Sequence, residues 1–222
     1  MKRATTISAL AAATLLASIA AFADGPVLVA CAGDSITQGI GTPQAADKSF
    51  PQSYPAQLQE LLGEGYAVTN FGVGGRTLLR KADPYGYGRP MKCGAKIAVI
   101  CLGTNDSKPY AWDAHGDEFE ADYERLVGEF LAQPSFERVF LCLPPPVFNG
   151  GQWGIREEIL AERIRPAIRR VAAKTGCEVI DLATPLSDCA GSFPDRVHPN
   201  PDAARRIAAV VAAAIKSDPP KQ

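Results

Sequence analysis

The stretch VLVACAGDSITQG, Val27–Gly39, decides the fold of this chain. It begins as a short apolar run and turns polar at Gly33, Asp34 and Ser35. An apolar run of this length that ends in turn residues is typical of a buried parallel strand. Open α/β sheets hold their ligands at the carboxyl ends of such strands. The sequence therefore places Ser35 where a nucleophile would stand, although Gly-Asp-Ser is also an ordinary turn.

Strand and helix patterns alternate along the rest of the chain. Further strands are predicted at Tyr66–Asn70, Lys96–Leu102, Arg138–Leu143 and Glu178–Leu182. Helical patterns cover Tyr54–Leu62, Asp117–Ala132, Ile155–Thr175 with a kink expected at Pro166, and a last helix from Asn200-Pro201 to about Lys216. This alternation predicts parallel βαβ units in one doubly wound α/β sheet.

The amino terminus has the composition of a secretory signal peptide. Lys2 and Arg3 precede an apolar stretch from Ile7 to Ala21, and Ala21-Phe22-Ala23 forms an A-x-A cleavage pattern. Residues 1–23 are therefore predicted to be removed, with 24–222 forming a single domain that is exported to the periplasm or secreted. A retained amino-terminal anchor is the alternative, although the stretch is short for a membrane span.

Charge and cysteine content narrow the possible partners and cofactors. The net charge is −1, and it becomes −3 without Lys2 and Arg3, so neither nucleic acid nor an anionic membrane surface is an expected partner. Three of the six cysteines, Cys31, Cys101 and Cys142, lie in apolar runs and are expected to be buried. A disulfide is plausible among Cys93, Cys177 and Cys189. Two histidines and no C-x-x-C pair argue against a zinc site.

A serine nucleophile needs a general base, which is most often histidine. The chain has two histidines, His115 and His198. His115 precedes a predicted helix, where a solvated or capping role is the simpler interpretation. His198 follows Asp195 by three residues, a spacing at which a turn can bring the carboxylate against one ring nitrogen while the other faces Ser35. A loop with a solvated Asp195 is the alternative.

Ester hydrolysis also needs donors that stabilise an oxyanion. Gly75 lies in a glycine-rich loop after the second strand, and Asn105 follows the third. A glycine turn and an Asx turn are the ordinary alternatives at these two positions. Other motifs fail: Gly72-Val73-Gly74 is not continued by the third glycine of a dinucleotide site, no phosphate-binding loop occurs, and the G-x-S-x-G nucleophile elbow is absent around Ser35.

Four blocks of the chain together resemble the SGNH or GDSL hydrolases. They are Gly33-Asp34-Ser35, Asn70 through Gly75, Gly103-Thr104-Asn105-Asp106, and Asp195-x-x-His198, in the family's order. The resemblance implies a flavodoxin-like three-layer α/β/α sandwich with a five-stranded parallel sheet of order 2-1-3-4-5. It also implies an ester hydrolase that needs no metal or other cofactor. Its oxyanion hole would comprise the N–H groups of Ser35 and Gly75 and the Asn105 amide.

Within the family, the segments SYPAQLQELL, NFGVGG, LGTNDSKP and LCLPPPVF are most similar to exported carbohydrate O-acetylesterases of the acetylxylan or sialate type. Arg196 departs from the pattern, because the family often has a small residue such as glycine there. Asp34 and Asp106 are interpreted as residues that organise their loops.

Several aromatic residues in predicted loops could stack on sugar rings, or could pack within their own loops. They are Tyr85, Tyr87, Tyr110, Trp112, Phe148 and Trp153. The predicted function is removal of O-acetyl groups from a carbohydrate through an acetyl-enzyme on Ser35. The alternatives are a lysophospholipase, thioesterase or lipase of the same family, and a carbohydrate-binding protein without catalysis. The sequence leaves the glycan and the oligomeric state open.

Overall fold

The structure is a computed structural model that describes residues 25–83, 86–148 and 152–217. The predicted signal peptide, residues 1–23, and Tyr85 lie outside these ranges. No helix in the described part of the chain has both the length and the apolar character needed to cross a membrane.

A parallel five-stranded sheet forms the centre of the molecule, in the order β2-β1-β3-β4-β5. Its strands are β1 (Val27–Gly33), β2 (Tyr66–Gly72), β3 (Ile97–Cys101), β4 (Arg138–Leu143) and β5 (Glu178–Asp181). The predicted α/β class and strand order are confirmed. In this order β1 and β3 lie side by side, so the chain turns to opposite sides of the sheet on leaving them. Such a switch point opens a crevice at the carboxyl ends of the strands.

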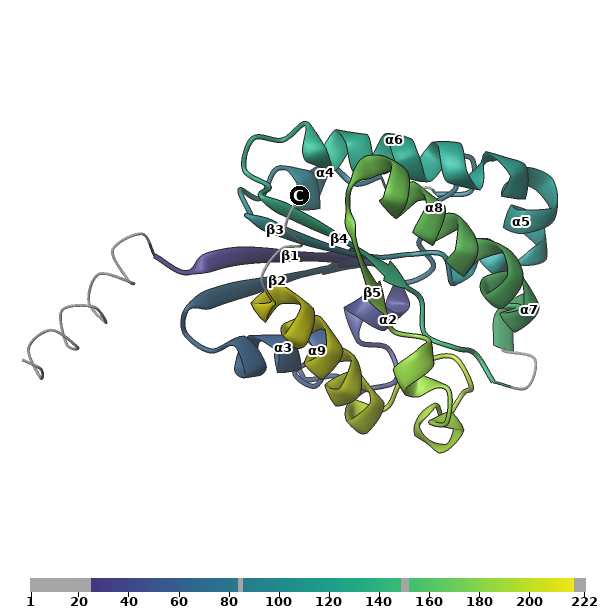
Figure 1. Ribbon diagram of the computed structural model, residues 1–222. Coiled ribbons are helices and arrows are strands. Elements are labelled where there is room, and N and C mark those ends of the chain that lie inside the picture. Colours follow the sequence, from purple (N-terminus) through teal and green to yellow (C-terminus); the bar gives the residue numbers. More distant parts are fainter. Residues whose placement is uncertain (1–24, 84–85, 149–151, 218–222) are drawn as a thin grey trace, which may run out of the picture.

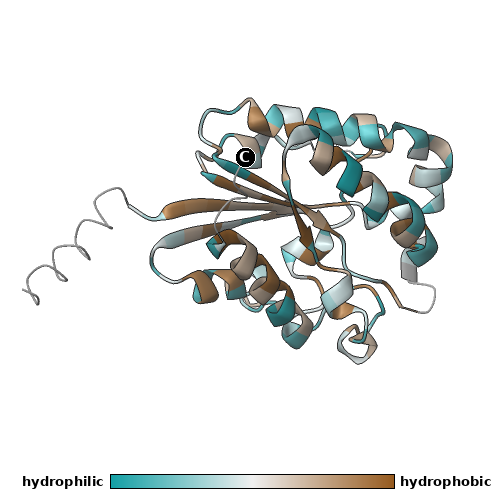
Figure 2. Ribbon diagram, in the orientation of Figure 1, coloured by the Kyte–Doolittle hydropathy of each residue, from teal (hydrophilic) through white to brown (hydrophobic). Residues whose placement is uncertain are grey.

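Helices cover both faces of the sheet (Figure 1). One face packs against α6 (Phe119–Leu131) and α8 (Arg165–Thr175), and the other against α3 (Tyr54–Leu62) and α9 (Pro201–Lys216). A hydrophobic core lies on each face of the sheet, and successive strand residues point into opposite cores. In β3, Ala98 and Ile100 face α6 and α8, whereas Val99 and Cys101 face α3 and α9. Because both faces are covered, the middle strand β3 is apolar along its whole length, and hydrophobic colour predominates in the centre of the sheet in Figure 2.

The remaining helices are short: α2 (Ser35–Gln38), α4 (Gly88–Met91), α5 (Pro109–His115) and α7 (Glu157–Ile159). Both α4 and α5 lie where the sequence predicts loops. Proline explains the start of α5, because Pro109 occupies the first helical position, where its missing N–H costs nothing.

The predicted kink at Pro166 takes the form of a π-helical turn. Leu160–Ile164 separates α7 from α8, and the N–H of Arg165 donates to the carbonyl of Leu160, five residues earlier. Pro166 has no N–H, so an undisturbed α-helix would lose a bond here. The wider turn accommodates the proline, and α8 begins directly around it.

The described residues contain no disulfide, so the bridge expected among Cys93, Cys177 and Cys189 is not formed. The three thiols lie in different surroundings. Cys177 packs against the core under α6 and α8, Cys189 belongs to the core under α9, and the Cys93 thiol donates to the carbonyl of Pro90 at 3.0 Å. Sequence position near a loop did not bring these cysteines together. Cys31, Cys101 and Cys142 are buried, as predicted.

Candidate active site

Ser35 lies directly beyond the end of β1, as the first residue of α2. Asp34 caps this helix by accepting the N–H of Ile36 at 2.9 Å. The tight strand-to-helix turn depends on glycine at two positions. A Cβ atom on Gly33 would lie 2.1 Å from Thr37 Oγ1, and one on Gly72 would lie 2.1 Å from the backbone nitrogen of Gln38. Both glycines therefore let α2 seat against the strand ends, with Ser35 at the crevice.

His198 and Asp195 complete a hydrogen-bonded chain with Ser35. His198 Nε2 lies 2.8 Å from Ser35 Oγ, and His198 Nδ1 lies 2.6 Å from Asp195 Oδ2. With its proton on Nδ1, the ring donates to the carboxylate and accepts from the hydroxyl. The imidazole is buried, with 6% of the residue exposed. The structure thus brings together residues from opposite ends of the chain in the geometry of an activated serine.

The loop around Asp195 fixes both of its carboxylate oxygens. Oδ1 accepts the N–H groups of Val197 at 3.0 Å and His198 at 2.7 Å, while Oδ2 faces the imidazole. Burial alone would raise the pKa of Asp195, but these bonds from His198 and Val197 outweigh it and lower that pKa. Arg196 adopts a φ of 68°, in the left-handed region that favours glycine. The backbone there explains why a small residue is expected at this position.

Two of the predicted oxyanion donors, Gly75 and Asn105, lie beside Ser35. All three line one cavity. The Asn105 amide donates to the carbonyl of Arg76 at 3.0 Å, which orients the side chain and leaves its second hydrogen for a ligand. Ser35 is the first residue of α2, so its N–H is among those that a helix leaves unpaired. The cavity can therefore offer several donors to one oxygen.

Side chains from α2 and β2 hold the loop that contains Gly75. Gln38 Oε1 accepts the N–H of Gly74 at 2.8 Å, and Asn70 Oδ1 accepts the N–H of Gly72, also at 2.8 Å. Asn70 in turn donates to the carbonyl of Thr37 at 2.8 Å. These bonds tie the glycine loop to the helix that carries Ser35. Sequence reasoning missed Gln38, although a polar residue one turn after the nucleophile is a usable signal.

The cavity beside Ser35, which we call the catalytic cavity for the role proposed below, has a volume of about 220 Å³. Its walls combine Ser35, His198, Gly75 and Asn105 with four residues of other segments: Ile40, Lys108, Trp153 and Ile155. The Trp153 ring stands edge-on to His198, with ring centroids 5.3 Å apart, and the residue is 56% exposed. Trp153 also holds a φ of 61°, a left-handed conformation that costs free energy in a residue with a large side chain.

The other described aromatic residues that were predicted to stack on a sugar do not line this cavity. Trp112 packs against Phe119 at 5.7 Å in the core under α6, and Phe148 packs against Phe193 at 5.1 Å on the opposite face. Tyr110 is 58% exposed but is not part of the cavity wall. Tyr87 donates through its hydroxyl to the carbonyl of Thr77 at 2.7 Å. Packing within the fold accounts for Trp112 and Phe148. Of the predicted aromatic residues within the described ranges, Trp153 is the one that lines the cavity beside Ser35.

Two further carboxylates lie buried behind the site. Burial raises the pKa of Asp34 to about 6, although the hydrogen bond from the Ile36 N–H acts to lower it. Burial also raises the pKa of Asp106 to about 7. Asp106 accepts the N–H groups of Leu78 and Leu79 at 2.8–3.0 Å, which anchors the segment after the glycine loop. Both carboxylates therefore have the loop-organising contacts that the sequence predicts.

His115 lies apart from this site, with its Nδ1 3.4 Å from Glu118 Oε1 at the end of α5. Within the described residues, no group of three or more histidine, cysteine or acidic side chains is arranged to hold a metal ion.

Comparison with known proteins shows which family the chain belongs to. Residues 31–206 match the model of the GDSL-like lipase/acylhydrolase family. The matched range includes Ser35, Gly75, Asn105, Asp195 and His198.

The chain is also 38% identical over 224 aligned residues to an acetylxylan esterase of Xylanibacter ruminicola. That alignment covers 90% of this chain and 45% of the relative, so the chain spans about half the length of the protein it matches.

Solved structures share the fold at lower identity. A carbohydrate acetylesterase from Sinorhizobium meliloti is 22% identical, with a TM-score of 0.67 over 85% of this chain and 97% of its own. An aryl esterase from M. smegmatis is 21% identical, with a TM-score of 0.69 over 85% of this chain and 98% of its own.

Proposed function

This chain belongs to the GDSL-like lipase/acylhydrolase family, and we propose that it is a serine esterase that removes O-acetyl groups from a carbohydrate. The observation that carries the proposal is the hydrogen-bonded chain from Ser35 Oγ through His198 to Asp195, beside Gly75 and Asn105. The acetylxylan esterase of Xylanibacter ruminicola, 38% identical, supports the choice of an acetylated glycan as substrate.

In the proposed reaction, Ser35 Oγ attacks the acetyl carbonyl while His198 Nε2 takes the hydroxyl proton. Asp195 holds the imidazole with its proton on Nδ1 and stabilises the imidazolium that forms. Collapse of the tetrahedral intermediate breaks the ester bond, and His198 gives its proton to the departing sugar hydroxyl. Water, deprotonated by the same His198, then attacks the acetyl-enzyme and releases acetate.

The developing negative charge would lie on the carbonyl oxygen of the acetyl group. We assign its stabilisation to the N–H groups of Ser35 and Gly75 and to the Asn105 amide, because all three residues line the cavity. Donors held in place before the reaction stabilise such an oxyanion without reorganising. The bonds of Gln38 to Gly74 and of Asn105 to Arg76 provide this fixed geometry.

The small catalytic cavity, about 220 Å³, favours a short acyl group over a long one. The test compares p-nitrophenyl acetate with p-nitrophenyl octanoate, with Ser35→Ala measured beside each. Octanoate adds six methylenes, and a pocket that buried them would gain about 0.8 kcal/mol for each. We expect acetate to be preferred and Ser35→Ala to be inactive. A strong preference for octanoate would favour the lipase or thioesterase alternative, and no hydrolysis of either ester would contradict the proposal.

We also propose that residues 1–23 direct export and are removed, so that one hydrolase domain, 24–222, acts in the periplasm or outside the cell. The basic start, the apolar stretch and the A-x-A pattern support this. Mass spectrometry of the protein recovered from a cell-envelope extract should give an amino terminus at Asp24. A product that retains Met1 in the cytoplasmic fraction would contradict export.

A further inference from the structure

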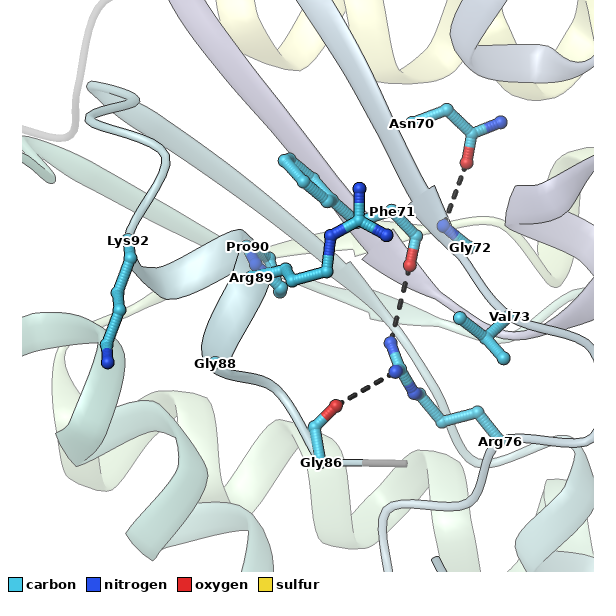
Figure 3. A pocket seen from close by; sticks show the side chains of 10 residues that line it. All are labelled: Asn70, Phe71, Gly72, Val73, Arg76, Gly86, Gly88, Arg89, Pro90 and Lys92. Carbon is cyan, nitrogen blue, oxygen red and sulfur yellow. Dashed lines mark hydrogen bonds between the residues drawn. The ribbon is translucent and has the colours of Figure 1, made fainter. Parts of the chain in front are cut away.

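A second and larger cavity lies along the open edge of the sheet. Its volume is about 550 Å³, and it is formed between the end of β2 and α4 (Figure 3). β2 is an edge strand, so this cavity is not closed by a neighbouring strand. Its walls come from two separate segments, Asn70–Arg76 and Gly86–Lys92.

Three cationic residues and no carboxylate are among the residues that line this cavity: Arg76, Arg89 and Lys92. The chain as a whole has a net charge of −1, so its composition does not explain this local excess. In Figure 3 the guanidinium groups of Arg76 and Arg89 both approach Phe71, whereas Lys92 stands at the other end of the cavity. The positive charge is therefore concentrated at the end nearer the glycine loop.

Arg76 is a fixed part of the cavity wall. It is 5% exposed, its Nη2 donates to the carbonyl of Gly86 at 2.8 Å, and its guanidinium carbon lies 4.7 Å from the centre of the Tyr87 ring. Arg89, in contrast, is exposed, and its guanidinium lies 6.0 Å from the centre of the Phe71 ring. No salt bridge to Arg89 or Lys92 is formed within the described residues. Exposed arginines of this protein commonly do pair with carboxylates, as Arg205 does with Glu60.

The cationic cavity adjoins the catalytic cavity through the glycine loop. Arg76 follows Gly75 directly, and its carbonyl accepts the Asn105 amide that also lines the catalytic cavity. The catalytic cavity carries a cation of its own, Lys108, and again no carboxylate among its lining residues. A ligand that extends from Ser35 past the glycine loop therefore meets positive charge on both sides of it.

We propose that the cavity between β2 and α4 is a subsite for the carboxylate of an acidic sugar in the glycan whose acetyl group is removed at Ser35. The inference rests on the proposed function, since it names a class of substrate for that reaction. An arginine fork matches a carboxylate with two parallel hydrogen bonds, which gives orientation as well as affinity. Arg89 supplies the guanidinium that engages the ligand, while Arg76 contributes fixed charge and shape.

The test compares two acetylated xylo-oligosaccharides of equal length, one bearing a glucuronic acid and one neutral, by the rate of acetate release. For the unaltered protein we expect kcat/KM to be about tenfold higher for the acidic substrate. This is near the lower end of what one hydrogen bond to a charged group contributes, because the exposed Arg89 must be ordered by the ligand. In Arg89→Gln the ratio should fall toward one. Arg89→Lys keeps the charge but loses the fork, so its ratio should be intermediate.

Arg205→Gln is the matched control, because it makes the same chemical change at an exposed arginine on α9, under the opposite face of the sheet. It should retain the full preference. A ratio near one in the unaltered protein, or an unchanged ratio in Arg89→Gln, would overturn the subsite while leaving the esterase intact. Absence of activity on both oligosaccharides and on p-nitrophenyl acetate would count against the proposed function instead.

Binding to Ser35→Ala tests the subsite without hydrolysis. Calorimetric titration with the deacetylated glucuronic-acid oligosaccharide should show tighter binding than the neutral one, and the difference should shrink as salt screens the charges. Equal binding of the two sugars would overturn the subsite. Inorganic phosphate that binds as tightly as the acidic sugar would also overturn it, because the cavity would then be a general anion site.

Discussion

The catalytic cavity and the cavity between β2 and α4 differ in how their polar groups are held. In the first, Ser35, His198, Asp195 and Asn105 are each fixed by hydrogen bonds within the protein. In the second, Arg76 is fixed as well, but the Arg89 side chain is exposed and stands in a cavity more than twice as large. Groups that perform chemistry must be positioned before the reaction. Groups that select a substrate can become ordered when it binds. We therefore expect variants of the catalytic cavity to change kcat, and variants of the cavity between β2 and α4 to change the preference in kcat/KM between substrates.

Among variants that keep Ser35, His198 and Asp195, the largest effect is expected for the proposed oxyanion donor Asn105. Its replacement by alanine removes one fixed hydrogen bond that strengthens in the transition state, so kcat should fall about a hundred- to a thousandfold. The loss should be similar for p-nitrophenyl acetate and for an acetylated glycan, as steady-state rates on both would show. A change in KM alone would show that Asn105 binds substrate and does not stabilise the transition state, which would contradict the difference drawn between the two cavities.

Gln38 tests whether the glycine loop must be held. In Gln38→Ala the N–H of Gly74 loses its acceptor, and the loop can shift away from Ser35. Small misplacements of catalytic groups cost up to about a hundredfold in rate, and we expect a loss in kcat of about tenfold. Circular dichroism and the melting temperature serve as controls for folding. An unchanged kcat would show that Asn70 and the turn itself are sufficient.

Trp153 combines a feature of each cavity: it contacts the hydrogen-bonded His198, as the catalytic groups do, but it is largely exposed, as Arg89 is. An aromatic face can stack on a sugar ring, which the small p-nitrophenyl ester does not require to the same degree. In Trp153→Ala we expect KM for an acetylated glycan to rise about three- to tenfold, with Trp153→Phe close to the unaltered protein. An equal loss on both substrates would indicate that Trp153 acts through His198.

The carboxylates of the catalytic end predict how stability depends on pH. Burial raises the pKa of Asp34 to about 6 and that of Asp106 to about 7, above the ordinary 3.8. Between about pH 4 and 7 the folded protein thus holds more protons than the unfolded chain, and stability declines as pH rises through this range. The lowered pKa of Asp195 has the opposite sign, so its contribution is lost in acid, below about pH 4.

Thermal denaturation between pH 3 and 9 measures this dependence. We expect the melting temperature to be highest near pH 4–5 and to fall by about a few degrees toward pH 7. Asp106→Asn keeps an oxygen to accept from Leu78 or Leu79 and should flatten the decline. A melting temperature that rises from pH 4 to 7 would contradict the claim that burial disfavours the charged form of Asp34 and Asp106.

Much of this fold could be predicted because each signal is local. The apolar run ending at Gly33 and the capping pair Asn200-Pro201 each depend on neighbouring residues, and the strand and the helix appear where expected. The spacing of three residues suggested the contact between Asp195 and His198, and the strand end suggested the position of Ser35. The resemblance of the four blocks to the SGNH or GDSL hydrolases is what joined Ser35 to His198, 163 positions away. The structure gives the 2.8 Å and 2.6 Å distances that the spacing could only suggest.

Other features that need two distant segments, and that no motif marks, could not be predicted. Trp112 and Phe148 lie in irregular sequence, but each meets a phenylalanine of another element and packs there. The bond from Gly74 to Gln38 joins residues 36 positions apart. The cationic cavity likewise requires α4 to lie against β2, and the sequence predicted a loop where α4 forms.

The measurement that tests the central claim most directly is covalent trapping of Ser35. A fluorophosphonate probe reacts with a serine only when a neighbouring base activates it. Intact and peptide mass spectrometry should show one adduct, on Ser35, with none in Ser35→Ala. Labelling of His198→Ala should be slower by about a hundredfold or more. An adduct on another serine, or labelling of His198→Ala at the rate of the unaltered protein, would contradict the account.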